Sequence, residues 1–115
     1  MQIVINSEFG GFGLSTEAFA RYLDIKGIKY ETQESKWREK AFFNEGHVGE
    51  DDHWLSEYDI DREDPALVQV VKELGAKANG PYSRLKIVTI PDDVEYYIDE
   101  YDGMESIHEN HRTWR

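Results

Sequence analysis

The sequence predicts a single α/β domain, residues 1–115, in which a mostly antiparallel four-stranded sheet carries two helices on one face. Three observations support this fold class. Two segments repeat apolar residues at helical spacing, several short segments have the length and composition of strands, and Asp102-Gly103 is a strong hairpin signal. The expected strands are 2–6, 84–90, 94–101 and a hairpin partner after Gly103.

The first helix is expected at residues 16–26. Ser15 carries a side-chain oxygen suited to capping the first turn, and Glu17 is favourable beside the positive end of the helix dipole. Gly27 ends the pattern, because glycine readily adopts the left-handed conformation that terminates helices. The side chains expected to face the sheet are Phe19, Tyr22 and Leu23.

The second helix is expected at residues 65–78. Asp64 is a favourable N-cap, Pro65 suits the first helical position, and Asn79-Gly80 ends the pattern. Gly75 lies inside this helix, where it predicts close packing against another backbone. The side chains expected to be buried are Leu67, Val70, Val71 and Leu74.

The C-terminal hairpin is predicted in detail by its turn. A two-residue loop at Asp102-Gly103 sets the register of the strands before and after it. Residues 104–111 also fit helical spacing, but we favour a strand because of this turn. The expected cross-strand pairs are Tyr101 with Met104 and Ile98 with Ile107, and the face expected to be buried carries Tyr96, Ile98 and Ile107.

The negative charge of the chain is concentrated in one segment. The net charge is −11, and residues 31–64 hold twelve acidic and four basic side chains. We predict an irregular acidic excursion at 31–62 with a short helical piece near 35–43, dispensable for folding. This charge disfavours direct DNA binding, which requires Lys and Arg to neutralise phosphates. The aromatic residues expected to be exposed there are Trp37, Phe42, Phe43 and Trp54.

Composition also bears on compartment and assembly. The chain has no cysteine, no signal-peptide pattern and no apolar run long enough to cross a membrane, so we expect a protein of a reducing cytoplasm. Three Trp, seven Tyr and five Phe are more aromatic side chains than a domain of this size readily buries. We therefore expect a homo-oligomer.

Residues 6–15 form the most informative junction, because an apolar strand runs through three glycines into a helix. Backbone N–H groups of a glycine-rich turn and a helix N-terminus together suit a phosphate or a similar anion. The spacing matches neither the dinucleotide-binding nor the P-loop motif. A tight turn with two packed phenylalanines, Phe9 and Phe12, is the favoured interpretation from this pattern alone.

Two groups of residues suggest a metal, and neither is sufficient. His108 and His111 are three residues apart, whereas the zinc motif H-E-x-x-H places its histidines four apart on a helix. Clustered carboxylates attract divalent cations, but a solvated acidic loop is the favoured interpretation of the second group. Its members are His47, Asp51, Asp52 and His53.

No pattern indicates an enzyme, and we expect no cofactor. Asp99 and Glu100 are adjacent on a strand and face opposite sides, so they cannot act as a pair. The terminal segment leaves two interpretations open. Arg112, Trp114 and Arg115 suit a nucleotide through ring stacking and guanidinium forks, or Trp114 docks into the core beside solvated arginines.

Several blocks of the sequence form an ordered pattern that covers about two thirds of the chain. They are Gln2-Ile-Val-Ile-Asn-Ser-x-x-Gly-Gly-Phe-Gly-Leu-Ser15 with residues 6–15 as its core, Asp64–Gly75, Ala78-Asn79-Gly80, Ile90-Pro-Asp-Asp93, Glu100-Tyr-Asp-Gly103 and His111-Arg-Thr-Trp114. These blocks resemble a family of small phage and prophage proteins, the first class of Thoeris anti-defence "sponge" proteins. The acidic segment 31–62 is the part that departs from the pattern.

The resemblance implies a non-enzymatic protein that binds and sequesters cyclic ADP-ribose isomers made by host TIR-domain immune enzymes. Some members of the family also take up cyclic oligonucleotides. It further implies a homo-oligomer built from dimers, with a hexamer as the expected assembly and ligand pockets between protomers. The site residues that it suggests are Phe9, Gly10, Gly11, Phe12 and Arg112 within matching blocks, and Asn79, Tyr82 and Arg84 in or beside them.

Two other functions remain open from the residues. An acidic protein of this size can mimic nucleic acid and block a basic host protein, and this reading predicts regular rows of surface carboxylates. A small nucleotide hydrolase with Asp99 or Glu95 as its base is the other alternative, and it predicts that the ligand is consumed.

Overall fold

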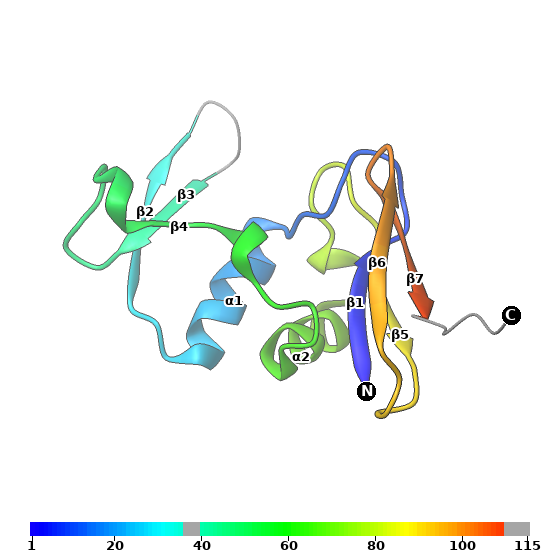
Figure 1. Ribbon diagram of the computed structural model, residues 1–115. Coiled ribbons are helices and arrows are strands. Elements are labelled where there is room, and N and C mark those ends of the chain that lie inside the picture. The colour runs from blue at the N-terminus through cyan, green and yellow to red at the C-terminus, as the bar shows by residue number, and fades with distance from the viewer. Residues whose placement is uncertain (36–39, 110–115) are drawn as a thin grey trace, which may run out of the picture.

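The computed structural model describes residues 1–35 and 40–109, which form one compact mixed α/β domain. Its strands belong to three small antiparallel sheets that flank a central pair of helices (Figure 1). Two short 3₁₀ segments, η1 and η2, flank β4, and a third, η3, follows α2. The elements are β1 (Gln2–Asn6), α1 (Thr16–Lys26), β2 (Tyr30–Glu34), β3 (Lys40–Asn44), η1 (Asp51–His53), β4 (Trp54–Leu55), η2 (Glu57–Asp59), α2 (Pro65–Leu74), η3 (Gly75–Ala78), β5 (Leu85–Thr89), β6 (Tyr96–Tyr101) and β7 (Met104–Glu109).

Both helices begin at the residues predicted from their N-caps. The Ser15 hydroxyl accepts a hydrogen bond from the Ala18 N–H at 3.1 Å, and the Asp64 carboxylate accepts one from the Ala66 N–H at 2.9 Å. Gly27 ends α1 with a φ of 72°. The helix starts and the end of α1 are therefore confirmed.

The second helix is shorter than predicted. Gly75 adopts a φ of 56°, so α2 ends at Leu74 and the chain continues as η3 to Ala78. The expectation that Gly75 allows close packing is wrong, because a Cβ built there would meet no atom within 4 Å. This glycine is required by its backbone conformation, since a side chain at positive φ is strained.

The predicted helical core is confirmed. The helix α2 packs against β1 and α1 packs against α2, and apolar side chains of both helices share one cluster with Val4 of the strand. Six of the seven predicted side chains are buried and the seventh, Leu74, is partly buried. The buried six are Phe19, Tyr22, Leu23, Leu67, Val70 and Val71.

The prediction of a single four-stranded sheet is wrong. β1 pairs with β5 and β6 pairs with β7, but the two pairs form separate sheets. The reason is that the free edge of β1 already has partners. The Val4 N–H donates to the Arg62 carbonyl at 2.9 Å, and the Asn6 N–H donates to the Glu105 carboxylate at 2.8 Å. A further strand has no unpaired N–H groups to join at these positions.

The hairpin register is confirmed pair by pair. Tyr101 faces Met104 and Ile98 faces Ile107, and the last element described is the strand β7. The face expected to be buried is half-buried, because the hairpin lies beside β1 without extending its sheet. Residues 110–115 lie outside the described part of the chain.

The acidic segment is more regular than predicted. It forms the sheet β2–β3–β4, and residues 40–43, expected to be helical, belong to β3. Phe42 is 2% exposed, and its ring centroid lies 4.9 Å from that of Phe19 in an edge-to-face arrangement. Burial of this ring on the core favours a strand here, so the helical piece and the exposure of Phe42 are wrong. Phe43 is also buried, Trp54 is 48% exposed, and Trp37 lies outside the described residues.

Two consecutive carboxylates connect the helical layer to the hairpin. The Tyr22 hydroxyl and the Lys26 ammonium donate to Asp64 at 2.8 and 3.2 Å, and the Tyr96 hydroxyl donates to Glu63 at 2.5 Å. Burial alone would raise the pKa of Asp64, but the hydrogen bonds that it accepts outweigh burial and hold its pKa below the usual value. Burial and the bond to Glu63 raise the pKa of Tyr96 to about 12.

Candidate functional site

Two segments that carry most of the proposed site residues lie side by side. Leu14 and Asn79 form an isolated antiparallel bridge, and the Gly80 N–H donates to the Gly13 carbonyl at 3.2 Å. A Cβ built on Gly10 would lie 2.7 Å from the Cβ of Tyr82. The glycine-rich turn and the residues around Tyr82 therefore meet, while Arg112 lies outside the described residues.

Asn6 holds this junction together from inside. The residue is fully buried, and its amide nitrogen donates to the carbonyls of Glu8 and Gly103, both at 2.7 Å. Its amide oxygen accepts the N–H groups of Glu8 at 3.2 Å and Arg84 at 2.9 Å. One side chain thus joins three loops, and Arg84, itself exposed, is fixed through its backbone.

The glycines are needed for close packing between turns. Gly103 has a φ of 90°, and a Cβ there would lie 2.1 Å from the Gly11 nitrogen. Gly10 donates its N–H to the Asp102 carbonyl at 3.0 Å. These contacts support the tight-turn interpretation of residues 6–15 more strongly than an open cradle.

An internal carboxylate lies where the sequence suggested an anion. The N–H of Leu14, just before α1, donates to the carboxylate of Glu57, which is 1% exposed. The next N–H, that of Ser15, donates to the Ala78 carbonyl at 2.9 Å. Glu57 comes from the acidic segment, and no local sequence pattern marks it, because its contact spans 43 residues.

The two phenylalanines of the turn differ in their surroundings. Phe12 is 7% exposed, and the guanidinium carbon of Arg62 lies 3.6 Å from its ring centroid. Arg62 also forms a bidentate ion pair with Glu105, at 2.5 and 2.9 Å. The Phe12 ring is therefore not available to a ligand, whereas Phe9 is 52% exposed.

An aromatic cavity of about 520 Å³ opens between the β2–β3–β4 sheet and the turn at Pro81. Three of its rings present a large fraction of their surface to solvent: Trp54 is 48% exposed, Tyr58 64% and Tyr82 74%. Flat rings exposed around a cavity can stack on a planar ligand. Its lining consists of Ser35, Ala41, Phe43, Asp51, Trp54, Tyr58, Pro81 and Tyr82.

A second, helix-end cavity of about 260 Å³ lies at the start of α1, and Pro81 borders both cavities. Alternate residues of β3 separate them, with Lys40 and Phe42 facing the helix-end cavity and Ala41 and Phe43 facing the aromatic one. Here the Lys40 ammonium and the positive end of the helix dipole favour an anion. The other residues lining it are Leu14, Ser15, Thr16, Phe19, Asn79 and Gly80.

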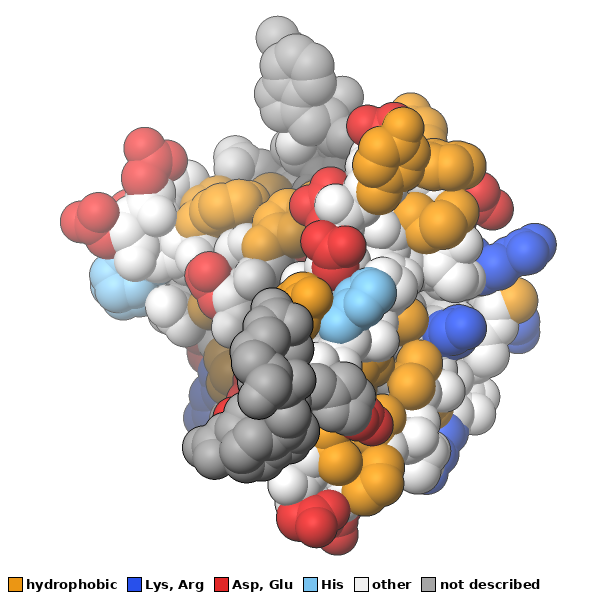
Figure 2. Space-filling view, turned by 45° about the vertical axis from the view of Figure 1, so that its right-hand side comes forward, with side chains coloured by type: hydrophobic (Ala, Val, Ile, Leu, Met, Phe, Trp, Pro, Cys, Tyr) orange, Lys and Arg blue, Asp and Glu red, His pale blue; other side chains and the backbone are white. Residues whose placement is uncertain are grey.

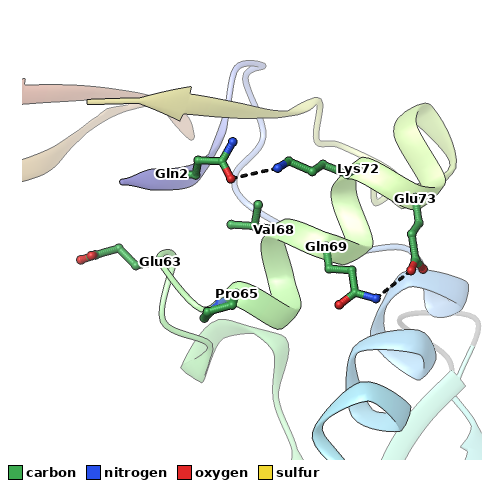
Figure 3. Close-up of a pocket in the computed structure, with 7 residues that line it drawn as sticks. All are labelled: Gln2, Glu63, Pro65, Val68, Gln69, Lys72 and Glu73. Atoms are coloured by element: carbon green, nitrogen blue, oxygen red, sulfur yellow. Dashed lines mark hydrogen bonds between the residues drawn. The ribbon is translucent and has the colours of Figure 1, made fainter. Parts of the chain in front are cut away.

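A third cavity, of about 520 Å³, runs along α2 and offers less to a ligand (Figure 3). Four of its five polar side chains are paired with one another, and the fifth, Glu63, accepts the hydroxyl of Tyr96. Lys72 donates to Gln2 at 2.9 Å, and Gln69 donates to Glu73 at 2.8 Å. None of the proposed site residues lines it.

The alternative catalytic carboxylates lie elsewhere. Asp99 and Glu95 are exposed, and neither lines the three cavities described above. Asp99 lies 3.9 Å from His108 across the exposed face of the hairpin.

The sequence identified Asn79 and Tyr82, which line the two neighbouring cavities, but missed Lys40 and Tyr58. Trp54 was noted only as an exposed aromatic residue. The aromatic pair Phe42-Phe43 was the signal that could have predicted β3, and with it the side of the strand to which Lys40 belongs.

Comparisons with family models, with curated proteins and with solved structures found no match to this chain. Among the described residues, neither helix has the length and apolar character required to span a membrane.

Proposed function

We propose that this protein is a non-enzymatic phage anti-defence protein that binds and sequesters a cyclic ADP-ribose-type nucleotide in the host cytoplasm. A cyclic oligonucleotide is the related ligand that the sequence resemblance implies. The observation that carries the proposal is the aromatic cavity, where Trp54, Tyr58 and Tyr82 expose their rings beside the helix-end cavity with Lys40. Its volume of about 520 Å³ lies within the range of small-molecule sites.

The two cavities suggest that the base and the phosphates of the ligand occupy different places. The base stacks on the exposed rings of the aromatic cavity, and the phosphates pass over Pro81 toward Ser15 and Lys40. A binder needs rings, backbone donors and cations, and it needs no nucleophile or general base. This mode keeps Asn79 and Tyr82 in the site and moves Phe12 into a structural role.

The aromatic cavity requires more positive charge than its described lining provides. Asp51 contributes a carboxylate there, and no Lys or Arg of the described chain lines it. A pyrophosphate binds best to a guanidinium fork. We therefore assign Arg112, and secondarily the exposed Arg84, to the ligand phosphates, with a second protomer as the donor of one of them.

An exposed hydrophobic surface supports assembly of protomers. It consists of side chains carried by the glycine-rich turn, the Tyr82 turn and the hairpin tip, and we call it the hairpin-end patch. Figure 2 shows hydrophobic side chains gathered at its upper right, with Lys and Arg side chains below them. The patch residues are Phe9 (52% exposed), Tyr82 (74%), Tyr101 (74%) and Met104 (37%).

A second copy of this chain is the proposed occupant of the patch, because its own cavity needs a cation from outside. Light scattering at micromolar concentration is expected to give an oligomer, and the double variant Tyr101→Ser/Met104→Ser is expected to dissociate it. The variant Tyr97→Ser, on the hairpin but outside the patch, is the matched control. A monomeric parent protein would remove the shared pocket.

Recovery of the ligand is the central test of the function. The purified protein is incubated with cyclic ADP-ribose isomers and, separately, with cyclic oligonucleotides, then heated and assayed for what it releases. Intact nucleotide in the released fraction supports sequestration. Consumption of the nucleotide supports the hydrolase instead, and failure to bind any nucleotide favours the acidic mimic.

Variants locate the site. Trp54→Ala and Tyr82→Ala should each weaken binding, by about 1–3 kcal/mol for a lost stacking ring, whereas Tyr97→Ala should not.

Arg112→Ala should lower the binding free energy by on the order of 2–5 kcal/mol if its charge pair with phosphate is buried, and Arg112→Lys should restore binding only in part. Arg21→Ala removes the same charge from α1, where Arg21 pairs with Glu73 and lines none of the three cavities described above, and is the control. Unchanged affinity in Arg112→Ala would place the site elsewhere.

A further inference from the structure

The loop that joins β3 to β4 is built from three successive turns of the same size. The N–H of His47 donates to the Asn44 carbonyl at 3.0 Å, that of Glu50 to the His47 carbonyl at 3.1 Å, and that of His53 to the Glu50 carbonyl at 2.9 Å. Gly46 precedes His47 at a φ of 85°, which lets the chain continue into the next turn.

This repeat places side chains three residues apart in one group. In each such turn the Cα atoms of residues i and i+3 lie within about 7 Å of each other, so their side chains can meet. The imidazole rings of His47 and His53 are stacked, with centroids 3.7 Å apart and planes 12° apart. The carboxylate of Glu50 lies 2.6 Å from Nδ1 of His47, and the Asn44 amide lies 3.3 Å from Nδ1 of His53.

The resulting group is a set of metal-ligating atoms. One nitrogen from each histidine and one oxygen from Glu50 all lie within 4.8 Å of one another. Both imidazoles are half-buried and the carboxylate is exposed, so solvent can reach the group. Within the described part of the chain, this is the group of His and acidic side chains with that geometry.

We propose that His47, Glu50 and His53 bind a Zn²⁺ ion, with water as the fourth ligand. Two imidazoles and one carboxylate form a ligand set that Zn²⁺ uses with an open position, whereas Mg²⁺ and Ca²⁺ prefer oxygen ligands alone. Tetrahedral ligands of Zn²⁺ lie about 3.3 Å apart, and an imidazole nitrogen binds in the plane of its ring, so binding brings the three ligand atoms closer and rotates the two stacked rings out of parallel. The exposed carboxylates of Asp51 and Asp52 add negative potential that attracts the cation.

The sequence grouped the two histidines with Asp51 and Asp52, and the structure replaces the aspartates by Glu50. The reason is the three-residue repeat, which leaves Asp51 and Asp52 out of the group. The Zn²⁺ site adjoins the aromatic cavity, because Trp54 follows His53 directly and lines that cavity. It does not depend on the proposed nucleotide, and its test is independent.

Metal affinity is measured on the full-length protein after treatment with a chelator. Zn²⁺ is titrated in competition with a chromophoric chelator, and the expected result is one ion per chain that excess Mg²⁺ or Ca²⁺ does not displace. Co²⁺ in place of Zn²⁺ should give the visible absorption of a four-coordinate ion. Absence of Zn²⁺ binding, or equal competition by Ca²⁺, overturns the proposal.

Variants assign the ligands. His47→Ala and His53→Ala should each weaken Zn²⁺ binding by more than about tenfold, which is the lower bound for loss of a supporting contact around a metal. His108→Ala is the control histidine, since it lies on β7 away from the group. Glu50→Gln should weaken binding much more than Asp52→Asn, because both remove one negative charge but only Glu50 is a ligand.

NMR spectra of the parent protein test the histidine ligands even if a variant fails to fold. The chain has four histidines. Zn²⁺ is expected to shift the ring ¹⁵N signals of two of them and leave the other two unchanged. Shifts at all four, or unchanged affinity in both His47→Ala and His53→Ala, overturn the assignment.

Discussion

The two ends of the molecule are attached to the helical centre by different kinds of contact (Figure 1). The hairpin β6–β7 is joined to β1 and to the segment before α2 largely through polar groups, namely the bonds of Asn6 to Gly103 and Glu105 and the Arg62–Glu105 ion pair. The sheet β2–β3–β4 is joined to α1 through the buried Phe42 ring. Both ends are acidic, since residues 96–109 also hold five Asp and Glu and no Lys or Arg, yet their attachments differ.

This difference shows that charge density does not predict how a segment is attached. Residues 31–64 hold twelve acidic and four basic side chains, yet the carboxylates are mainly exposed while Phe42 and Ile60 join the core. One acidic side chain, Glu57, is buried, and its carboxylate accepts the Leu14 N–H. The segment is solvated on its surface and structural at its inner face.

The largest expected effect is loss of folding when the acidic segment is removed. Replacement of residues 35–60 by a short Gly/Ser linker removes Phe42, Ile60 and the Glu57 carboxylate, so we expect no cooperative thermal unfolding. This reverses the expectation from the sequence that the segment is dispensable. Replacement of the turn 45–50 alone is the control, and it should keep a cooperative transition. A cooperative melt of the 35–60 replacement would show that the helical centre folds without this end.

The next largest effect is expected at a single contact of the same end. Phe42→Ala removes a fully buried ring that packs on Phe19, and should lower the free energy of unfolding by about 3–5 kcal/mol. Val48→Ala, in the same segment but 41% exposed, is the control and should change it by less than about 0.5 kcal/mol. Urea denaturation measures both, and equal losses would contradict a hydrophobic attachment.

A smaller effect is expected at the hairpin end. Glu105→Gln breaks a half-buried ion pair with Arg62, whose side chains are 9% and 21% exposed, and should cost about 1.5–3 kcal/mol. The pair Arg21–Glu73 is exposed at 45% and 37%, so Glu73→Gln should cost much less, because solvent screens an exposed ion pair. Chemical denaturation at low and high salt distinguishes the two variants. Equal costs would show that burial of the Arg62 pair contributes nothing.

The smallest effect is a decline of stability at alkaline pH. Burial, followed by hydrogen bonds to Asp64 and Glu63, raises the pKa of Tyr22 and raises that of Tyr96 to about 12. Above the ordinary tyrosine pKa of about 10, the unfolded chain releases protons that the folded chain retains, so stability falls as pH rises. Unfolding measured from pH 8 to 11 should show this slope. Tyr96→Phe and Tyr22→Phe should each flatten it, whereas Tyr58→Phe, 64% exposed, should leave it unchanged.

The candidate site was partly accessible from the sequence. Asn79 and Tyr82 were assigned to the site by resemblance, and they line neighbouring cavities. Lys40 was not found, and His47 and His53 were grouped with Asp51 and Asp52 rather than Glu50, because both outcomes depend on the path of a segment whose strands were not predicted. A three-residue repeat of turns has no apolar period, so pattern analysis does not detect it.

The sequence by itself determined the features that depend on neighbours a few residues away. The caps at Ser15 and Asp64, the hairpin register at Asp102-Gly103 and the apolar faces of both helices all follow from local hydrogen bonds and periodicity. Only the tertiary structure decided how the strands divide into sheets and what occupies the junction at residues 6–15. Those outcomes depend on contacts between residues 43 to 99 positions apart, such as Leu14–Glu57 and Asn6–Glu105, and local sequence does not encode which distant group fills an open edge.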